Sequence, residues 1–159
     1  MLLTLFMVNG TVVLVGNLPI DHLGFDQLVA EFGWSSKRVD TLADIGKLSL
    51  DYDLVSVLFE PKSLGFSWEK ALTSVMAAAP RALPILCHGF GEVLDWSQVS
   101  EAGAFHSLLI PLRAEEVRRS LGFVWCAQRI STPILPQRVP RRHRAISQRP
   151  APRQIHAVA

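Results

Sequence analysis

Residues 103–124 read Gly-Ala-Phe-His-Ser-Leu-Leu-Ile-Pro-Leu-Arg-Ala-Glu-Glu-Val-Arg-Arg-Ser-Leu-Gly-Phe-Val, a strand pattern followed by a helix pattern. Residues 107–110 form a short apolar run, the length of a strand covered on both faces, and Pro111 ends it because proline has no donor for the strand ladder. Glu115 and Glu116 favour a first helical turn, where the helix dipole stabilises acids. Val117, Leu121 and Val124 then repeat at helical spacing. The stretch predicts a buried, central strand followed by a helix with one apolar side.

The rest of the chain supplies the elements that a central strand needs around it. Apolar or β-branched runs predict four further strands, at residues 11–15, 37–39, 54–59 and 83–87. Apolar residues at helical spacing predict helices over residues 21–33, through Leu42, Ile45 and Leu48 with an interruption at Gly46, over 68–79 and over 95–102. Ser67 is the expected N-cap of the third helix, and the charged run at 37–39 suits the edge of a sheet.

Five predicted strands alternate with five predicted helices, and each connection is long enough for a crossover. The sequence therefore predicts an α/β fold, a doubly wound five-stranded parallel sheet of the flavodoxin-like kind with helices on both faces. Ligands of such sheets collect outside the carboxyl ends of the strands. Here those ends are Gly16-Asn17, Phe59-Glu60, His88-Gly89 and Ile110-Pro111.

Composition limits the chain to one domain and divides it into three parts. With 159 residues, 49% of them hydrophobic, it can bury one core but not two of ordinary size. We expect an apolar N-terminal extension over residues 1–10, a folded domain over 11–130, and a disordered Arg/Pro-rich tail over 131–159. The tail holds six arginines, five prolines and no acid, which leaves ten basic against 14 acidic residues in the rest of the chain.

The sequence also favours a cytoplasmic protein that does not enter a membrane. The first eight residues are apolar but too few to span a bilayer, and they lack the basic start and cleavage site of a signal peptide. Met7 is an alternative to Met1 as the start of the chain. Cys87 and Cys126 lie in apolar segments without the spacing of metal ligands, so we expect buried thiols of a reducing compartment.

Several motifs of the chain fit one known family. Val12-Val13-Leu14-Val15 reads as the first strand, Asp53-Leu54-Val55 opens the third, and Pro61 and Gly65 lie in the loop after it. The most specific group is Gly103-Ala104-Phe105 with Leu109-Ile110-Pro111-Leu112 and Glu115-Glu116. On these motifs, residues 11 to about 128 resemble the CheY-like receiver domains of bacterial response regulators.

The resemblance implies a phosphoryl switch whose chemical groups have been replaced. Receivers accept a phosphoryl group on an aspartate at the end of the third strand, with magnesium held by acids after the first strand, a hydroxyl after the fourth and a lysine before the strand-five proline. The matching positions here are Gly16, Asn17 and Leu18 for the acids, Val57 or Leu58 for the phospho-acceptor, Cys87 or His88 for the hydroxyl, and Ile110 for the lysine. Glu60 is the nearest acid and lies beyond the acceptor position. The resemblance thus implies a pseudoreceiver with no catalytic residue, metal or cofactor.

A pseudoreceiver would act by contact with a protein partner or with a second copy of itself. In receivers, the face made by the fourth helix, fifth strand and fifth helix carries such contacts. The equivalent residues here are Trp96, Val99, His106, Arg113, Arg118 and Arg119. Trp96 is the tryptophan best placed to be an exposed anchor, while Trp68 and Trp125 fit core or half-buried helix positions.

Two other functions are compatible with the residues. A flavodoxin-like small-ligand binder would use the loops at Asn17, Glu60 and His88, and a nucleic-acid-associated regulator would use the arginines of residues 138–144, which attract phosphates or acidic partners without reading sequence. Catalysis by Cys87 with His88 is disfavoured, because adjacent strand residues point to opposite faces and no third group orients them. Gly89-Phe90-Gly91 reads as a turn rather than a phosphate-binding loop.

Overall fold

The computed structural model describes residues 9–130. The predicted N-terminal extension, apart from its last two residues, and the predicted tail lie outside the described residues. The strands are β1 (Gly10–Val15), β2 (Ser35–Val39), β3 (Asp53–Phe59), β4 (Leu83–His88) and β5 (His106–Leu109). The helices are α1 (His22–Ala30), α2 (Leu42–Asp51), the 3-10 helix η1 (Lys62–Leu64), α3 (Trp68–Ala78), α4 (Trp96–Glu101) and α5 (Ala114–Ile130).

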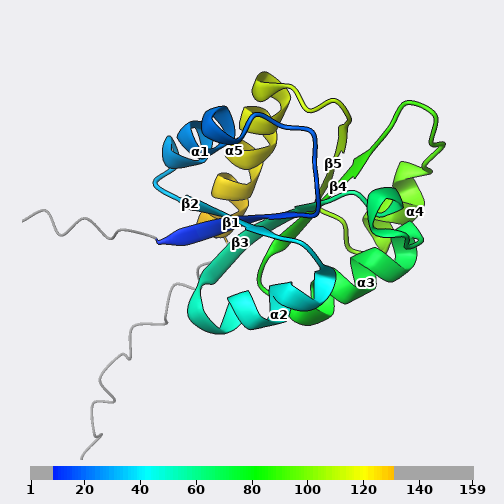
Figure 1. Cartoon of the computed structure of the whole chain (residues 1–159), viewed down its shortest axis with the longest axis horizontal. Helices are drawn as coiled ribbons and strands as arrows, with labels where there is room; N and C mark the ends of the chain where they lie inside the picture. Colours follow the sequence, from blue (N-terminus) through cyan, green and yellow to red (C-terminus); the bar gives the residue numbers. More distant parts are fainter. Residues whose placement is uncertain (1–8, 131–159) are drawn as a thin grey trace, which may run out of the picture.

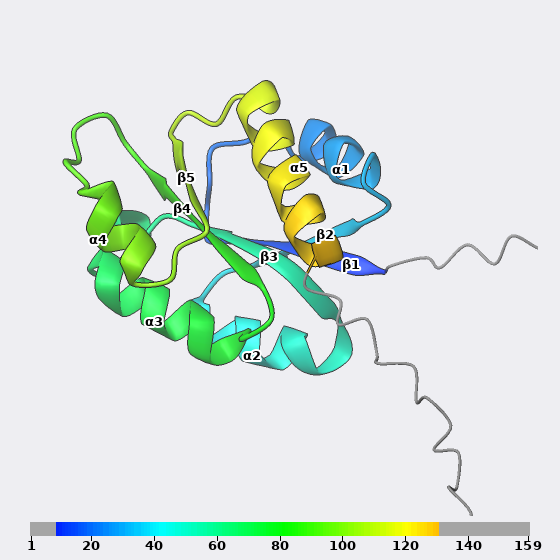
Figure 2. The same cartoon turned by 180° about the vertical axis from the view of Figure 1, so that it is seen from behind.

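The five strands form one parallel sheet in the order β2-β1-β3-β4-β5. Helices α1 and α5 cover one face, and α2, α3 and α4 cover the other (Figure 1 and, from behind, Figure 2). This arrangement confirms the predicted doubly wound α/β fold. Within residues 9–130, no helix is both long and apolar enough to cross a bilayer.

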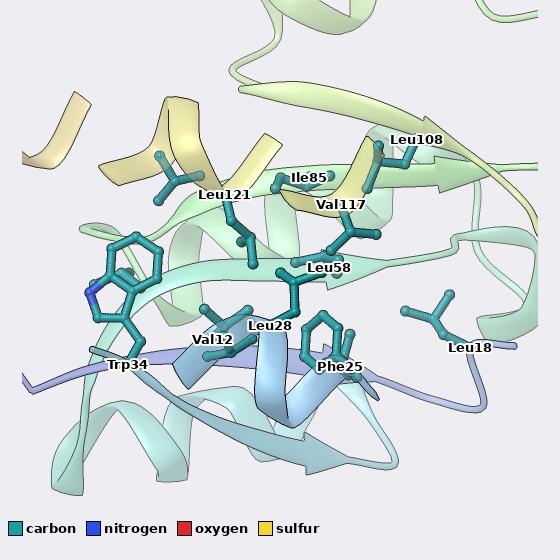
Figure 3. Close-up of a cluster of buried hydrophobic side chains, with 14 of the residues drawn as sticks. Val12, Leu18, Phe25, Leu28, Trp34, Leu58, Ile85, Leu108, Val117 and Leu121 are labelled. Atoms are coloured by element: carbon teal, nitrogen blue, oxygen red, sulfur yellow. The ribbon is translucent and has the colours of Figure 1, made fainter. Parts of the chain in front are cut away.

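Each face of the sheet has its own apolar core, because side chains alternate along a strand. Val12, Leu14 and Leu58 point to the α1/α5 face. Figure 3 shows Val12 and Leu58 in one cluster with Phe25, Leu28, Trp34, Val117 and Leu121. Val13, Val15 and Val57 point to the α2/α3 face, where Ile45, Leu72 and Val75 meet them. The central strands β1 and β3 are therefore buried on both sides.

The position of β5 contradicts the prediction of a central strand. β5 pairs with β4 alone and forms one edge of the sheet. Of its four residues only Leu108 is buried, while Leu109 is 36% exposed. Leu108 packs into the α1/α5 core. The only helix near β5 on the other face of the sheet, among the described residues, is α4, which has six residues. A short apolar run is thus as compatible with an edge as with a centre.

The other predicted elements are confirmed to within a few residues, and β2 is the second edge strand as expected. The hydroxyl of Ser67 accepts a hydrogen bond from the Lys70 amide at 3.3 Å, so Ser67 is the N-cap of α3. Gly46 does not interrupt α2, which continues through it from Leu42 to Asp51. Cys87 is buried as predicted, but the prediction for Cys126 was wrong, since it lies exposed on α5.

Candidate functional site

The carboxyl edge of the sheet begins with the turn after β1. Gly16 has a φ of 73°, a left-handed conformation that glycine adopts without strain, and its amide donates to the Val39 carbonyl at 2.8 Å. Asn17 is exposed to solvent. Leu18 turns back into the α1/α5 core and is only 3% exposed. The three positions that the sequence resemblance assigns to the acidic group of receivers therefore present one amide side chain at this edge.

The sequence resemblance offers two alternatives for the acceptor position, and both residues are apolar and buried. Val57 and Leu58 are each 0% exposed, with Val57 in the α2/α3 core and Leu58 in the α1/α5 core. Leu58 pairs with Leu14 in the sheet, one residue before the end of β1. Figure 3 shows Leu58 among the side chains of the α1/α5 core, which Leu18 also joins. An apolar core thus surrounds Leu58, one of the two positions that the sequence resemblance assigns to the acceptor.

The end of β4 places a thiol and an imidazole side by side in sequence but in different surroundings. Cys87 is 0% exposed, and burial raises the pKa of its thiol to about 12, with a further contribution from the negative charge of Glu60. His88 is half-buried, and its Nδ1 lies 3.4 Å from the Gly89 carbonyl oxygen. A thiol with a raised pKa is a poor nucleophile, so the geometry gives no support to a Cys87–His88 catalytic pair.

Ile110 and Glu60 complete this edge. The Ile110 amide donates to the His88 carbonyl at 2.8 Å, and the Ile110 side chain packs against the α1/α5 core. Glu60 is half-buried directly after β3. Within residues 9–130, no three His, Cys, Asp or Glu side chains come together in a group that could hold a metal ion.

A second feature of functional interest lies on the face formed by α4, β5 and α5. The imidazole of His106 contacts two rings edge-on, with centroids 6.3 Å from Trp96 of α4 and 6.1 Å from Phe123 of α5. Trp96 is 43% exposed and Phe123 is 50% exposed. Partial burial between its neighbours lowers the pKa of His106, which favours the neutral ring. We call Trp96, His106 and Phe123 the aromatic row.

The predicted contact residues divide on this face. Trp96 and His106 belong to the aromatic row, and Arg119 lines a depression of about 340 Å³ beside β5 together with His88 and Glu116. Arg113 is exposed in the loop between β5 and α5. Neither Asn17 nor Glu60 lines that depression, so it does not gather the three loops proposed for a flavodoxin-like ligand site.

Two of the predicted contact residues have to be withdrawn from this face. Val99 is 1% exposed and packs into the α2/α3 core, so it cannot touch a partner. Arg118 points to the α1 side of α5. Its Nε donates to Glu31 Oε2 at 2.9 Å, and its Nη2 donates to Glu31 Oε1 at 3.1 Å. In each case the helix is predicted correctly, but the direction of the side chain depends on how the helix lies on the sheet.

Three exposed residues of the face were missed from the sequence. They are Leu109 on β5 and Phe123 and Cys126 on α5. Phe123 follows Arg119 by four residues, and that helical spacing could have placed it on the same side of α5. Leu109 could not have been found, because nothing in its apolar run indicates the sheet edge.

The strand order 2-1-3-4-5 defines the class of protein as a flavodoxin-like doubly wound domain. Among solved structures, the chain has the fold of CheY-like receiver domains, and 229 chains match it. A signal receiver domain assigned to a Luxo repressor from Vibrio parahaemolyticus aligns with a TM-score of 0.63 and 17% identity, over 77% of this chain and 95% of that one. A response regulator receiver domain from Clostridium thermocellum aligns with a TM-score of 0.61 and 13% identity, over 76% and 98%.

A third similar structure contains a metal ion. The receiver domain of a sensor histidine kinase from Pseudomonas aeruginosa, with magnesium coordinated in its active-site cleft, aligns with a TM-score of 0.56 and 15% identity, over 74% of this chain and 98% of that one. The sequence itself matches no family model and no curated protein. At these identities the comparisons establish the fold, and the roles of individual residues rest on the geometry described above.

Proposed function

We propose that this protein is a receiver-like signalling module that carries no phosphoryl switch and acts through protein contact. The observation that supports the proposal is the burial of Val57 and Leu58, the two positions that the resemblance assigns to the acceptor; both are 0% exposed, and Leu58 shares its core with Leu18. Phosphoryl transfer to a receiver needs a carboxylate nucleophile and hard oxygen ligands for magnesium. The residues that the resemblance assigns to the acids and the acceptor (Gly16, Asn17, Leu18, Val57 and Leu58) supply no carboxylate, and Ile110 supplies no cation.

Incubation with acetyl phosphate and magnesium, followed by mass spectrometry of the intact protein, tests this proposal. We expect no gain of a phosphoryl group, while an ordinary receiver treated in parallel gains one. A stoichiometric adduct that maps to a carboxylate such as Glu60 or Asp40 would contradict the proposal. Omitting magnesium from a matched sample distinguishes metal-dependent transfer from chemical side reactions.

The aromatic row is the contact surface that we assign to the module. Large, half-exposed aromatic side chains are typical anchors of protein interfaces, because they bury much area with few rotatable bonds. Trp96, His106 and Phe123 come from three different elements, so the row is rigidly held by the fold. Arg119 adds a charge next to the row, and Leu109 and Cys126 are further exposed residues of the same elements. The partner is a protein or a second copy of the chain.

A further inference from the structure

The imidazole of His106 connects the two helices that flank the edge strand β5. Leu108 packs into the α1/α5 core, and His106 lies on the same face of β5, because side chains two residues apart on a strand point the same way. From this position the ring of His106 contacts Trp96 of α4 and Phe123 of α5, each edge-on. His106 is therefore the central ring of the aromatic row.

A histidine at the centre gives the row a property that phenylalanine or tyrosine would not. Its ring gains or loses a proton within the physiological range of pH. Neither Trp96 nor Phe123 carries an oxygen that could replace the water around a charged imidazole, so a proton on His106 is disfavoured between them. Partial burial accordingly lowers the pKa of His106. The assembled row is thus a surrounding for the neutral ring.

The depression beside β5 offers the ring a different surrounding. His106 lines this space of about 340 Å³ on one side, and Glu116 of α5 lines it as well. A nearby carboxylate stabilises an imidazolium, so this side of His106 favours the charged ring. Two other groups of the lining can carry positive charge, Arg119 of α5 and His88 of β4. Arg119 is exposed, and water screens its repulsion of a charged His106.

The remaining charged groups near the row do not replace Glu116. Asp95 and Glu101 lie at the two ends of α4. The Asp95 carboxylate already accepts a hydrogen bond from the Ser97 amide at 3.0 Å, and Glu101 is exposed. Within residues 9–130, Glu116 forms no ion pair, so its carboxylate is available to a protonated ring.

From this geometry we propose that His106 is a proton-operated switch: the neutral ring joins Trp96 to Phe123, and the protonated ring turns out of the row towards Glu116. The three elements stay in place, and only the side chain of His106 changes its rotamer. Acid would then divide the surface that a partner binds. The contact role of the row rests on the proposed function, whereas the movement of the ring does not.

An NMR titration of the full-length protein from about pH 8 to about pH 5 tests the switch. At the upper pH we expect nuclear Overhauser contacts from the His106 ring protons to the rings of Trp96 and Phe123. These contacts should be lost with the same midpoint as the titration of the His106 Cε1 proton. The midpoint should lie below that of histidine in an unstructured reference peptide, because partial burial disfavours the charged ring.

Three substitutions assign the change to individual groups. Glu116→Gln removes the counter-charge and should shift the midpoint to lower pH. His106→Gln should abolish the pH dependence of the Trp96 indole resonance over this range. His88→Gln is the matched control, since it removes the other histidine of the depression and should leave the loss of contacts in place.

Three results would overturn the proposal. Contacts that persist after His106 is protonated would show that the charged ring stays between its neighbours as a cation–π partner. A Trp96 resonance that titrates equally in His106→Gln would assign the change to another group, and a midpoint unaltered in Glu116→Gln would remove the counter-charge. A phosphoryl adduct in the acetyl phosphate experiment would refute the proposed function without altering these NMR results, so the two proposals fail separately.

Discussion

At Gly10 the fold leaves no room for a methyl group. A Cβ atom built there would lie 2.5 Å from Cδ1 of Trp34 and 2.7 Å from a side-chain carbon of Val55. We therefore expect Gly10→Ala to lower the free energy of unfolding by about 1–3 kcal/mol, the usual cost of overpacking a core. Urea unfolding monitored by tryptophan fluorescence measures this change, because Trp34 is the side chain that has to move.

Gly46 is the matched control for that substitution. It lies within α2, and a Cβ atom there would meet nothing within 4 Å. Gly46→Ala should raise the free energy of unfolding by about 0.5–1 kcal/mol, because alanine loses less backbone entropy than glycine when a helix forms. Equal effects of the two substitutions, in sign and size, would contradict the close approach of Trp34 to Gly10.

The two cysteines should differ sharply in reactivity. Cys126 is exposed, whereas burial raises the pKa of Cys87 to about 12 from 9.0. At pH 8 we expect a thiol reagent to modify one cysteine per folded chain quickly, and both after denaturation, because the thiolate is the reactive form. Cys126→Ser should abolish the fast reaction. Rapid modification of Cys87 in the folded protein would argue against its burial.

The same pKa shift makes a prediction about alkaline stability. The folded state keeps the Cys87 proton up to a higher pH than the unfolded state does, so the unfolded state binds fewer protons above about pH 9. The free energy of unfolding should therefore fall as the pH rises from about 9 towards 12. Cys87→Ala should show a smaller fall over this range, which unfolding curves at several pH values would detect.

At the scale of the elements, α5 is held by its apolar stripe rather than by its ion pair with α1. Val117, Leu121 and Val124 are each 0% exposed, whereas Arg118 and Glu31 are about half exposed. We expect Leu121→Ala to cost about 2–5 kcal/mol of unfolding free energy, as for other buried leucines. Arg118→Met should cost little, because exposed ion pairs contribute little and are screened by salt. Urea unfolding at low and high salt compares the two.

The ion pair nevertheless has a defined pH dependence. The hydrogen bonds from Arg118 hold the pKa of Glu31 below its usual value. The small stabilisation it brings is present above the pKa of an unfolded glutamate and is lost as the pH falls through the lower, folded-state pKa. A large loss of stability in Arg118→Met at neutral pH would contradict this assignment.

The elements were predictable because each depends on short-range patterns. The β-branched run of β1, the cap at Ser67 and the spacing of Val117, Leu121 and Val124 act within a few residues of one another. The order of strands depends on how distant segments pack, so the edge position of β5 could not be predicted from the residues of β5 alone. For the same reason the direction of Arg118 and Val99 could not be predicted, although their helices were.

The candidate site was predictable to a similar degree. The assignment of Val57 or Leu58 to the acceptor position depends on the resemblance alone and stays a prediction, while the structure shows that both side chains are buried. The aromatic row was found only in part, since Trp96 and His106 were named and Phe123 was not. The row joins residues from three elements, and such a contact requires the packed fold.

At the scale of the whole molecule, the aromatic row predicts how the protein associates. If a second copy binds there, an isologous contact would bring the two α5 helices and their exposed Cys126 residues together. We expect a concentration-dependent dimer in analytical ultracentrifugation and a disulfide-linked dimer under mild oxidation. Phe123→Asp should weaken both, because it places a charge in the apolar contact.

Leu23→Asp provides the control for that prediction, since it introduces the same charge at an exposed leucine of α1. A dimer that is weakened equally by both substitutions would not use the aromatic row. A protein that stays monomeric at high concentration, and whose Cys126 does not cross-link, would leave a different protein as the partner for this face.

The two ends of the described chain leave the fold at one edge of the sheet. The Gln128 side chain, near the end of α5, donates to the Val55 carbonyl at 3.4 Å, and Val55 follows Asp53, the partner of Gly10 at the start of β1. Figures 1 and 2 show the start of β1 and the end of α5 at the same end of the sheet. A circular permutant that joins residues 10 and 130 by a short linker and opens the chain at the exposed Gly65 turn should fold to the same architecture.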